Sequence, residues 1–157
     1  DVRQESVKRV AAAVGEGATI VTQAGNKAYL ERALATVTTI APDHLTKSKR
    51  KARVIPVVDR MVLGDGTRTI ELLHATDTNH SDTMLMAYLP KERLLIEADL
   101  FTPGPPNAPP PAQINPNNAN LVDNLARLDR PVDRILPLHG RVVPATELYS
   151  AVGEKAP

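Results

Sequence analysis

Residues 80–99 read HSDTMLMAYLPKERLLIEAD, and this stretch carries most of the information about the fold. It contains two apolar runs, Thr83–Leu89 and Leu94–Ala98, which are separated by the polar segment Pro90–Arg93. Two short apolar runs on either side of a turn signal are typical of an antiparallel β-hairpin. A histidine precedes this predicted hairpin and an aspartate follows it, so polar side chains lie at both of its ends.

The sequence upstream of this hairpin also predicts β-strands. Val54–Val58 and Met61–Leu63 are short apolar runs, and the segment Gly64-Asp65-Gly66 that follows them is a tight-turn signal. Thr67–His74 then alternates in polarity, which predicts a strand with one apolar face. Together with the hairpin, these runs indicate a β-meander rather than a series of parallel βαβ units.

Helices are predicted before the meander. Asp1–Val14 has its valines and alanines at helical spacing, and Ala18–Thr22 is typical of a short strand. A second helix is expected to begin with Asn26 as its N-cap and to turn Tyr29 inward. The segment Thr36–Arg53, with its run of basic residues, is predicted to be a solvated loop.

After the hairpin, residues 102–116 contain seven of the 14 prolines, so they are expected to form a Pro-rich surface loop without regular structure. Three further elements are predicted: a helix capped by Asn117 or Asn118, the strand Arg134–Leu138, and a closing helix that starts at Pro144. The whole order predicts a single α/β (α+β layered) domain over residues 1–157, with a mixed, mainly antiparallel sheet and flanking helices.

Composition excludes several kinds of protein. Lys and Arg number 19 and Asp and Glu 18, so the net charge of +1 gives no reason to expect a nucleic-acid or membrane-surface partner. The chain has no cysteine, which excludes disulfides and thiolate metal sites. No apolar run approaches the roughly 20 residues that a membrane helix needs. A tight metal site would therefore have to combine carboxylates with the four histidines.

Three polar residues share a position next to a predicted strand. His80 lies in a connection between two strands, Asp99 directly follows one strand, and His139 directly follows another. Loops at strand ends are where functional side chains gather, and imidazole and carboxylate are ligands of zinc, iron and manganese. Each residue also fits a structural role as a hydrogen-bonding, turn or cap residue. On the residues alone, both interpretations stay open.

The order and spacing of these residues resemble the second half of the metallo-β-lactamase family. There a loop histidine is followed by a hairpin whose last strand ends in Gly-Asp or Ala-Asp, as in the segment from His80 to Asp99. A later strand ends in a ligand histidine followed by Gly, and the segment Leu136-Pro137-Leu138-His139-Gly140 is similar. The resemblance covers Thr67–Gly140, and it implies half of an αββα sandwich in a metal-dependent hydrolase.

The resemblance also implies a role for each residue. His80 would be the third histidine of a first metal site, Asp99 the carboxylate that bridges two metal ions, and His139 a ligand of the second site. Asp82 would orient His80 or its loop from outside the ligand set. The implied cofactor is a divalent metal ion, with zinc as the first expectation and iron, manganese or cobalt as alternatives. No further catalytic residue is assigned.

The chain departs from the family because the upstream His-x-His-x-Asp-His motif is absent. The two other histidines do not replace it. His44, next to Pro42 and Asp43, is expected to be a surface turn residue, and His74, at the end of a strand, a packing or hydrogen-bonding residue. The sequence therefore predicts no complete two-metal site within one chain.

Three interpretations fit these observations. The chain is one portion of a hydrolase whose upstream part lies on another segment, which predicts an exposed apolar sheet face where that part packs. Alternatively, two copies form a homodimer that covers these faces and completes a metal site for hydrolysis of an ester, lactone or amide. In the third interpretation the chain is a non-catalytic metal-binding or interaction module, with the Pro-rich loop as a lid or contact surface. Substrate and compartment do not follow from the sequence.

Overall fold

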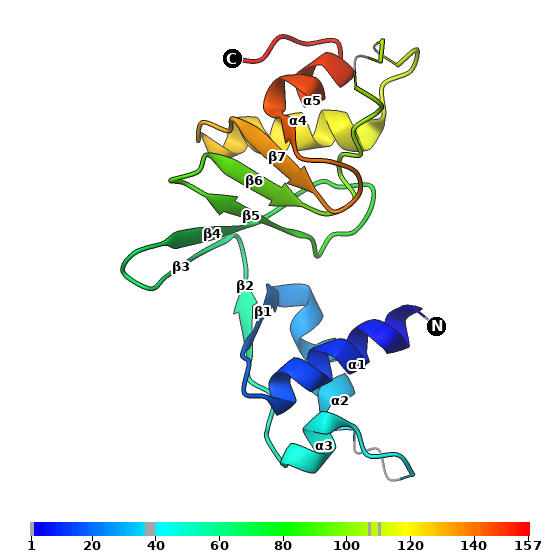
Figure 1. Ribbon diagram of the computed structural model, residues 1–157, viewed down its shortest axis with the longest axis vertical. Helices are drawn as coiled ribbons and strands as arrows, with labels where there is room; N and C mark the ends of the chain where they lie inside the picture. Colours follow the sequence, from blue (N-terminus) through cyan, green and yellow to red (C-terminus); the bar gives the residue numbers. More distant parts are fainter. Residues whose placement is uncertain (1, 37–39, 107, 110) are drawn as a thin grey trace. The chain divides into compact units, whose positions relative to one another are not determined.

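The computed structural model describes residues 2–36, 40–106, 108–109 and 111–157. The chain divides into two compact units, residues 1–58 and residues 59–157, and each unit is described by itself (Figure 1). The expectation of a single domain over residues 1–157 stays a prediction. None of the described helices is both long enough and apolar enough to cross a lipid bilayer.

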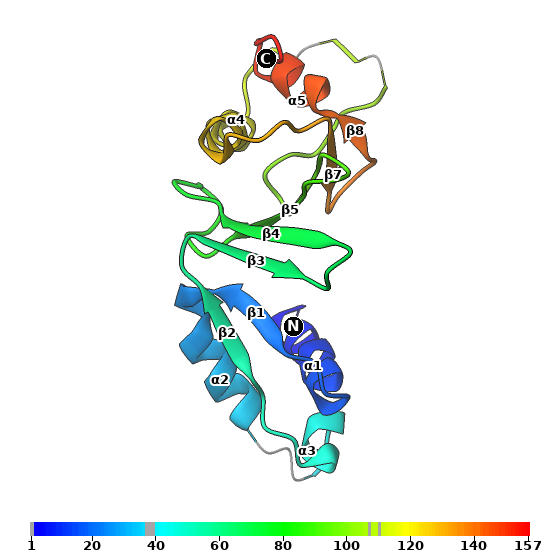
Figure 2. The ribbon, with the colours of Figure 1, turned by 90° about the vertical axis from the view of Figure 1, so that its left-hand side faces the viewer.

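The N-terminal unit combines helices with a small parallel sheet (Figure 2). Its described elements are α1 (Val2–Gly15), β1 (Ile20–Gln23), the 3-10 turn η1 (Ala24–Asn26), α2 (Lys27–Ala35), α3 (His44–Ser48) and β2 (Val54–Val57). β1 and β2 run in parallel, with Ile20 opposite Val54. A small core joins the helices, and its buried residues are Ala11, Val14, Leu34 and Leu45. Parallel strands usually belong to larger sheets that are covered on both faces, so a sheet of two such strands is unusual.

The structure corrects three details predicted for this unit. The segment predicted as a loop contains α3, because the Asp43 carboxylate caps this helix by accepting a hydrogen bond from the Thr46 backbone N–H at 2.7 Å. Residues 37–39 of that segment lie outside the described residues. Asn26 stands at the start of α2 as predicted, but its side chain makes no capping hydrogen bond. Tyr29 is 50% exposed rather than turned inward.

The C-terminal unit is a six-stranded sheet with two helices on one of its faces (Figure 1). Its elements are β3 (Arg60–Gly64), β4 (Thr69–His74), β5 (Leu85–Leu89), β6 (Leu94–Glu97), α4 (Pro116–Leu128), β7 (Arg134–Pro137), β8 (Val143–Pro144) and α5 (Ala145–Ala151). The strand order is β3-β4-β5-β6-β7-β8, and only β6 and β7 are parallel neighbours, because α4 forms the crossover between them. The predicted mixed, mainly antiparallel sheet with flanking helices is confirmed.

The boundaries of the two helices differ from the prediction. Asn115, and not Asn117 or Asn118, is the N-cap of α4, because its side chain accepts a hydrogen bond from the Asn117 backbone N–H at 2.9 Å. Pro116 then occupies the first turn of α4, where its missing N–H costs no hydrogen bond. Pro144 is the N-cap of α5 rather than its first residue, and it ends the short strand β8, which was not predicted.

The core of the C-terminal unit lies between the sheet and its helices. Leu95 of β6, Leu121 of α4 and Ile135 of β7 are each 0% exposed within this core. Because side chains alternate along a strand, the residues that directly precede and follow Leu95 in β6 and Ile135 in β7 point to the opposite face of the sheet.

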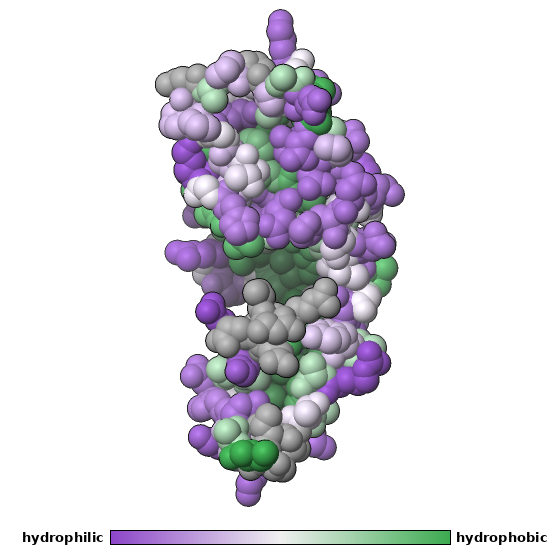
Figure 3. Space-filling model, turned by 90° about the vertical axis from the view of Figure 1, so that its right-hand side faces the viewer, coloured by the Kyte–Doolittle hydropathy of each residue, from purple (hydrophilic) through white to green (hydrophobic). Residues whose placement is uncertain are grey.

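That opposite face is apolar, and we call it the open sheet face. The register places one of its residues from each of five strands in a row: Met61, Leu72, Ala87, Ile96 and Leu136. All five are only partly buried. Leu63 and Ile70 on the same face are each 38% exposed. Figure 3 shows apolar residues (green) gathered on the surface of this unit. The C-terminal unit by itself thus has an apolar sheet face, and its exposure for want of a packing layer stays a prediction.

Candidate functional site

The sheet topology brings His80, Asp99 and His139 to one edge of the C-terminal unit. Asp99 follows β6 and His139 follows β7, and these parallel neighbours end at the same edge of the sheet. β5 is antiparallel to β6, so the β4–β5 loop that carries His80 lies at this edge as well. The three residues predicted as metal ligands are thus brought together, although the two histidines are 59 positions apart in the sequence.

The Asp99 carboxylate lies between the two imidazoles. Its Oδ1 is 3.0 Å from His139 Nε2, and its Oδ2 is 3.5 Å from His80 Nε2. Each carboxylate oxygen therefore faces the Nε2 atom of a different histidine. The side chains of His80, Asp99 and His139 are 49%, 33% and 63% exposed, so water reaches all three.

The backbone at Asp99 lies in the left-handed region, with a φ of 65°. Such a conformation is costly for a residue other than glycine, so neighbouring contacts must hold it in place. Glu97 provides them, because its Oε2 accepts hydrogen bonds from the backbone N–H groups of Leu100 at 2.8 Å and Phe101 at 3.3 Å. The Glu97 carbonyl oxygen also accepts a bond from the Leu138 N–H at 2.9 Å, at the end of β7. Glu97 thus ties the turn at Asp99 to the next strand.

Glu97 was not predicted as part of this site. It is 3% exposed, and its Oε1 has no hydrogen-bond partner among the described residues. Burial raises the pKa of its carboxyl group, and the charge of Asp99 raises it further, whereas the hydrogen bonds from Leu100 and Phe101 oppose this change. One signal in the sequence points to Glu97. It lies two residues after Leu95 in the same strand, so both side chains point to the same face of the sheet and a charged group faces the core.

The remaining predicted residues lie beside the site or far from it in the chain. Asp82 is exposed, and its side chain makes no hydrogen bond within the described part of the chain, so its role in orienting His80 stays a prediction. The Asp82 carbonyl oxygen is 2.8 Å from His74 Nε2, which confirms His74 as a hydrogen-bonding residue. His44 is exposed as expected, but it begins α3 in the N-terminal unit instead of standing in a turn.

The start of the Pro-rich loop lies against the turn that follows His139. Gly140 has a φ of 102°, and a Cβ atom at this position would lie 3.2 Å from the Pro103 side chain. Arg141 donates a hydrogen bond to the Gly104 carbonyl oxygen at 3.4 Å. The glycine after His139 is therefore required both by its backbone conformation and by the close approach of the loop.

The residues of the site match a divalent metal ion in donor type but do not form a complete metal site. Two ligands that bind one tetrahedral zinc ion at about 2.0–2.1 Å lie about 3.3–3.4 Å from each other. The observed N···O distances of 3.0 and 3.5 Å are close to this range. However, the described residues contain no group of three or more His, Asp and Glu side chains arranged to hold a metal ion. Further ligands, or a change in side-chain positions, are needed.

Comparison with known proteins shows the fold. No protein-family model and no curated protein matches the sequence. A metallo-β-lactamase from Pontibacter korlensis matches with a TM-score of 0.58 at 15% identity, over 90% of this chain and 60% of that chain. The Flv1 flavodiiron core from Synechocystis matches with a TM-score of 0.59 at 17% identity, over 90% of this chain and 36% of that chain. An archaeal metallo-β-lactamase superfamily protein from Sulfolobus tokodaii matches with a TM-score of 0.50 at 13% identity, over 83% and 55%.

The chain therefore has the metallo-β-lactamase fold, as the resemblance around His80, Asp99 and His139 implied. It spans 60% or less of the length of these three solved structures. At this level of identity the similarity establishes the scaffold, and the chemistry has to be argued from the site itself.

Proposed function

We propose that His80, Asp99 and His139 form part of the divalent metal centre of a hydrolase with the metallo-β-lactamase fold. The observation that supports this most directly is the convergence of the three side chains around the Asp99 carboxylate. Stability alone is a poor explanation for this convergence. Exposed ion pairs contribute about 0–1 kcal/mol, whereas a residue held in a sparsely populated backbone conformation costs about 1–3 kcal/mol.

The ligand types leave several metals open. Zinc is the first choice for imidazole and carboxylate ligands, and iron, manganese or cobalt also suits them. Iron has specific support, because the similar structures include flavodiiron proteins from Giardia intestinalis and Synechocystis. When bound, the metal ion would polarise a substrate carbonyl and make a bound water more acidic.

The chain's own residues would hold and orient this centre. His80 and His139 offer their Nε2 atoms, and Asp99 offers one oxygen to each side, which suits a carboxylate that bridges two metal ions. The partial exposure of all three side chains leaves room for water and a substrate. With the centre completed, hydrolysis of an ester, lactone or amide is the reaction we propose.

The missing ligands would come from whatever covers the open sheet face. A second copy of the chain or a further segment of the protein fits this role, because each would bury the row from Met61 to Leu136. The proposal is consistent with the partial coverage of the similar solved structures, because this chain spans only 35–61% of the length of eight of them.

Metal content and molar mass test the proposal together. The chain, purified without chelators, is analysed for bound metal and by light scattering, and we expect about one metal ion per chain in a dimer. His80→Ala and Asp99→Ala are each expected to weaken zinc binding at least about tenfold. His44→Ala is the matched control, because it removes an exposed histidine of the N-terminal unit and should leave binding unchanged.

The other outcomes separate the alternatives. A monomer that binds metal shows that this chain's own side chains suffice to hold an ion, and it contradicts a second copy as the source of the missing ligands. A dimer that takes up no zinc contradicts the completion of the site by a second copy. A monomer that takes up none leaves the further segment and the non-catalytic interaction module. Metal binding that survives Asp99→Ala also contradicts the proposed ligand set.

A further inference from the structure

His80 lies in the β4–β5 loop (residues 75–84), and the loop is closed at its base. The Ala75 N–H donates to the Met84 carbonyl oxygen at 3.1 Å, which extends the pairing of the two strands. Ala75 is 0% exposed. The position of a ligand on a long loop is imprecise unless other groups fix the backbone of the loop, so the residues between this base and His80 need further contacts.

One side chain of α4 pairs with this loop as a neighbouring strand would. Asn124 is 2% exposed, and its Oδ1 accepts a hydrogen bond from the Thr76 N–H at 3.0 Å. Its Nδ2 donates to the Thr76 carbonyl oxygen at 3.1 Å. Both backbone groups of one residue are thus satisfied by a single amide. An aspartate cannot donate to the carbonyl and a leucine can do neither, so the amide is specifically required.

Two neighbours on the same face of α4 extend this contact. Asn120 Nδ2 donates to the carbonyl oxygens of Thr76 and Asp77, at 3.0 Å each. Arg127 Nη2 donates to Asn124 Oδ1 at 2.6 Å, and Arg127 Nη1 donates to the Thr76 hydroxyl. Asn120, Asn124 and Arg127 are spaced at i, i+4 and i+7, so they form one polar stripe on the helix. We call these three residues the α4 clamp.

The contacts continue from the α4 clamp to His80. Thr78 is 8% exposed, and its hydroxyl donates to the Ser81 carbonyl oxygen at 2.6 Å and accepts from the Ser81 N–H at 3.1 Å. These two bonds close the short turn that contains His80. Asp77, between the clamp and this turn, has a φ of 59°, so the path of the backbone is set at an unusual conformation.

We infer that the α4 clamp is the positioning element that sets His80 opposite Asp99. The inference rests on the proposed function, because a fixed position of His80 matters only if His80 is a metal ligand. The clamp residues act through the backbone of Thr76 and Asp77 and touch no reacting group. Groups that fix the orientation of a ligand typically change metal affinity by about 10- to 100-fold when they are removed.

The test uses two variants of the full chain and one control. Asn124→Leu removes both bonds to Thr76, and Asn120→Ala removes two bonds to the loop while keeping a good helix former in α4. Asp123→Ala changes an exposed neighbour on the same helix and is the control. The two readouts are the dissociation constant for Co²⁺ and the NMR signals of the imidazoles of His80 and His139.

A positioning role predicts that both clamp variants bind Co²⁺ at least about tenfold more weakly than the control. The His80 signals should shift or broaden while those of His139 stay unchanged, which general destabilisation would not produce. If Asn124→Leu does not fold, Asn120→Ala decides the question. Unchanged His80 signals in the folded variants overturn the inference. A wild-type chain that binds no Co²⁺ counts against the proposed function alone, because the NMR comparison needs no metal.

Discussion

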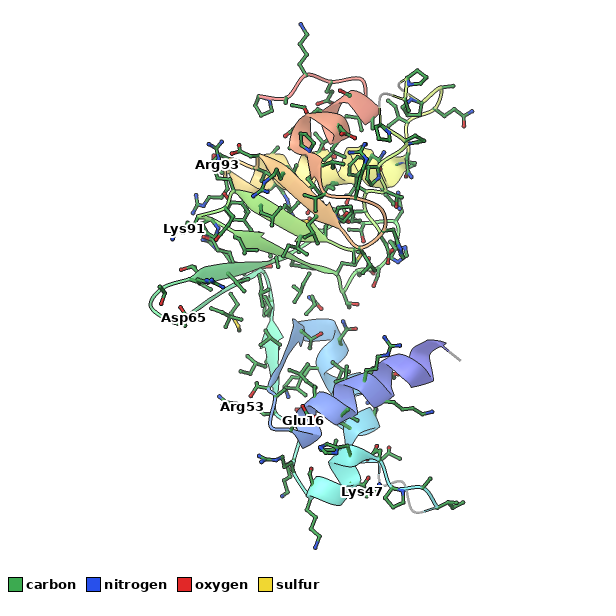
Figure 4. All side chains as sticks on the ribbon, viewed as in Figure 1. Glu16, Lys47, Arg53, Asp65, Lys91 and Arg93 are labelled. Atoms are coloured by element: carbon green, nitrogen blue, oxygen red, sulfur yellow. The ribbon has the colours of Figure 1, made fainter. Side chains whose placement is uncertain are left out.

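The N-terminal unit is basic, whereas the C-terminal unit is acidic. Residues 1–58 contain ten Lys and Arg against five Asp and Glu, and residues 59–157 contain nine against thirteen. The net charge of +1 is therefore an average over two units of opposite sign. Lys47 and Arg53, both exposed and labelled in Figure 4, contribute to the positive charge of the first unit. The small net charge of the whole chain therefore does not describe the charge that either unit presents to a partner.

The two units also differ in how they are held together. The N-terminal unit has a four-residue buried core and a two-stranded parallel sheet, whereas the C-terminal unit has a twelve-residue core between six strands and two helices. Isolated two-stranded sheets are at best marginally stable, and more strands or helix packing are needed for independent stability. We therefore expect the C-terminal unit, which carries the candidate site, to be the more stable of the two.

The largest expected effect comes from a matched pair of core substitutions, Leu95→Ala in β6 and Leu45→Ala in α3. Leu95 is 0% exposed within the larger core, so its truncation should cost about 3–5 kcal/mol, near the upper end of the range for Leu→Ala. Leu45 is 6% exposed in a core of four residues that can collapse more easily, so about 2–3 kcal/mol is expected. Urea denaturation measures the loss of stability in each variant, and amide hydrogen exchange shows in which unit that loss occurs.

The control is the unit that was not mutated. Leu45→Ala should accelerate amide exchange in α1 to α3 and leave β5 to β7 protected at the wild-type level. Equal acceleration in both units would contradict the difference in stability, because it would mean that the chain unfolds as one cooperative body.

Local sequence patterns predicted most of the strands, but they missed short elements and the exact start of a helix. The hairpin over residues 80–99 could be recognised because apolar runs and a turn signal follow each other within a short distance. The helix α3 and the strand β8 were missed because each is short and depends on a single local contact or a neighbouring strand. The correct N-cap of α4 was missed because the following proline made Asn115 look like part of the loop.

The three proposed ligands of the candidate site were predicted from their positions next to strands and from a family resemblance. His80, Asp99 and His139 each lie next to a strand, and the order and direction of the strands bring the three side chains together. Glu97 and Asn124 could not be assigned a role from the sequence. The contacts of Asn124 with Thr76 join residues 48 positions apart, and no local pattern announces a side chain that acts through the backbone of a distant loop.

A smaller effect is expected for Glu97, an acidic residue that is buried in the C-terminal unit. Glu97→Ala removes the acceptor of the Leu100 and Phe101 N–H groups, which should cost about 1–3 kcal/mol. Glu97→Gln keeps an acceptor oxygen and removes a buried charge, so its cost should stay below about 1 kcal/mol. Urea denaturation at pH 7 measures both variants. Glu31→Ala, which breaks an exposed ion pair of the N-terminal unit, is the control and should cost no more than about 0.5 kcal/mol.

The Gln variant is the informative member of this set. If Glu97→Gln destabilises the protein as much as Glu97→Ala does, the negative charge itself is needed. The two hydrogen bonds to the turn at Asp99 would then not be the reason for its presence.

The smallest expected effect compares one helix N-cap from each unit, Asp43 of α3 and Asn115 of α4. Asp43→Ala and Asn115→Ala each remove a side-chain acceptor, and each should cost about 1 kcal/mol at neutral pH. Only the first should depend on pH. The hydrogen bonds from Thr46 hold the pKa of the Asp43 carboxyl below its usual value of 3.8.

The sign of this dependence follows from linkage. A lowered pKa in the folded state means that the Asp43 contribution is fully present above pH 3.8 and is lost as the pH falls through the lower, folded value. The stability difference between wild type and Asp43→Ala should therefore shrink in acid, whereas that for Asn115→Ala should not. Asp43→Asn should cap α3 without the acid dependence. Amide exchange in α3 measured between neutral and acidic pH checks this, and an acid-independent difference for Asp43→Ala would show that its carboxylate is not the cap.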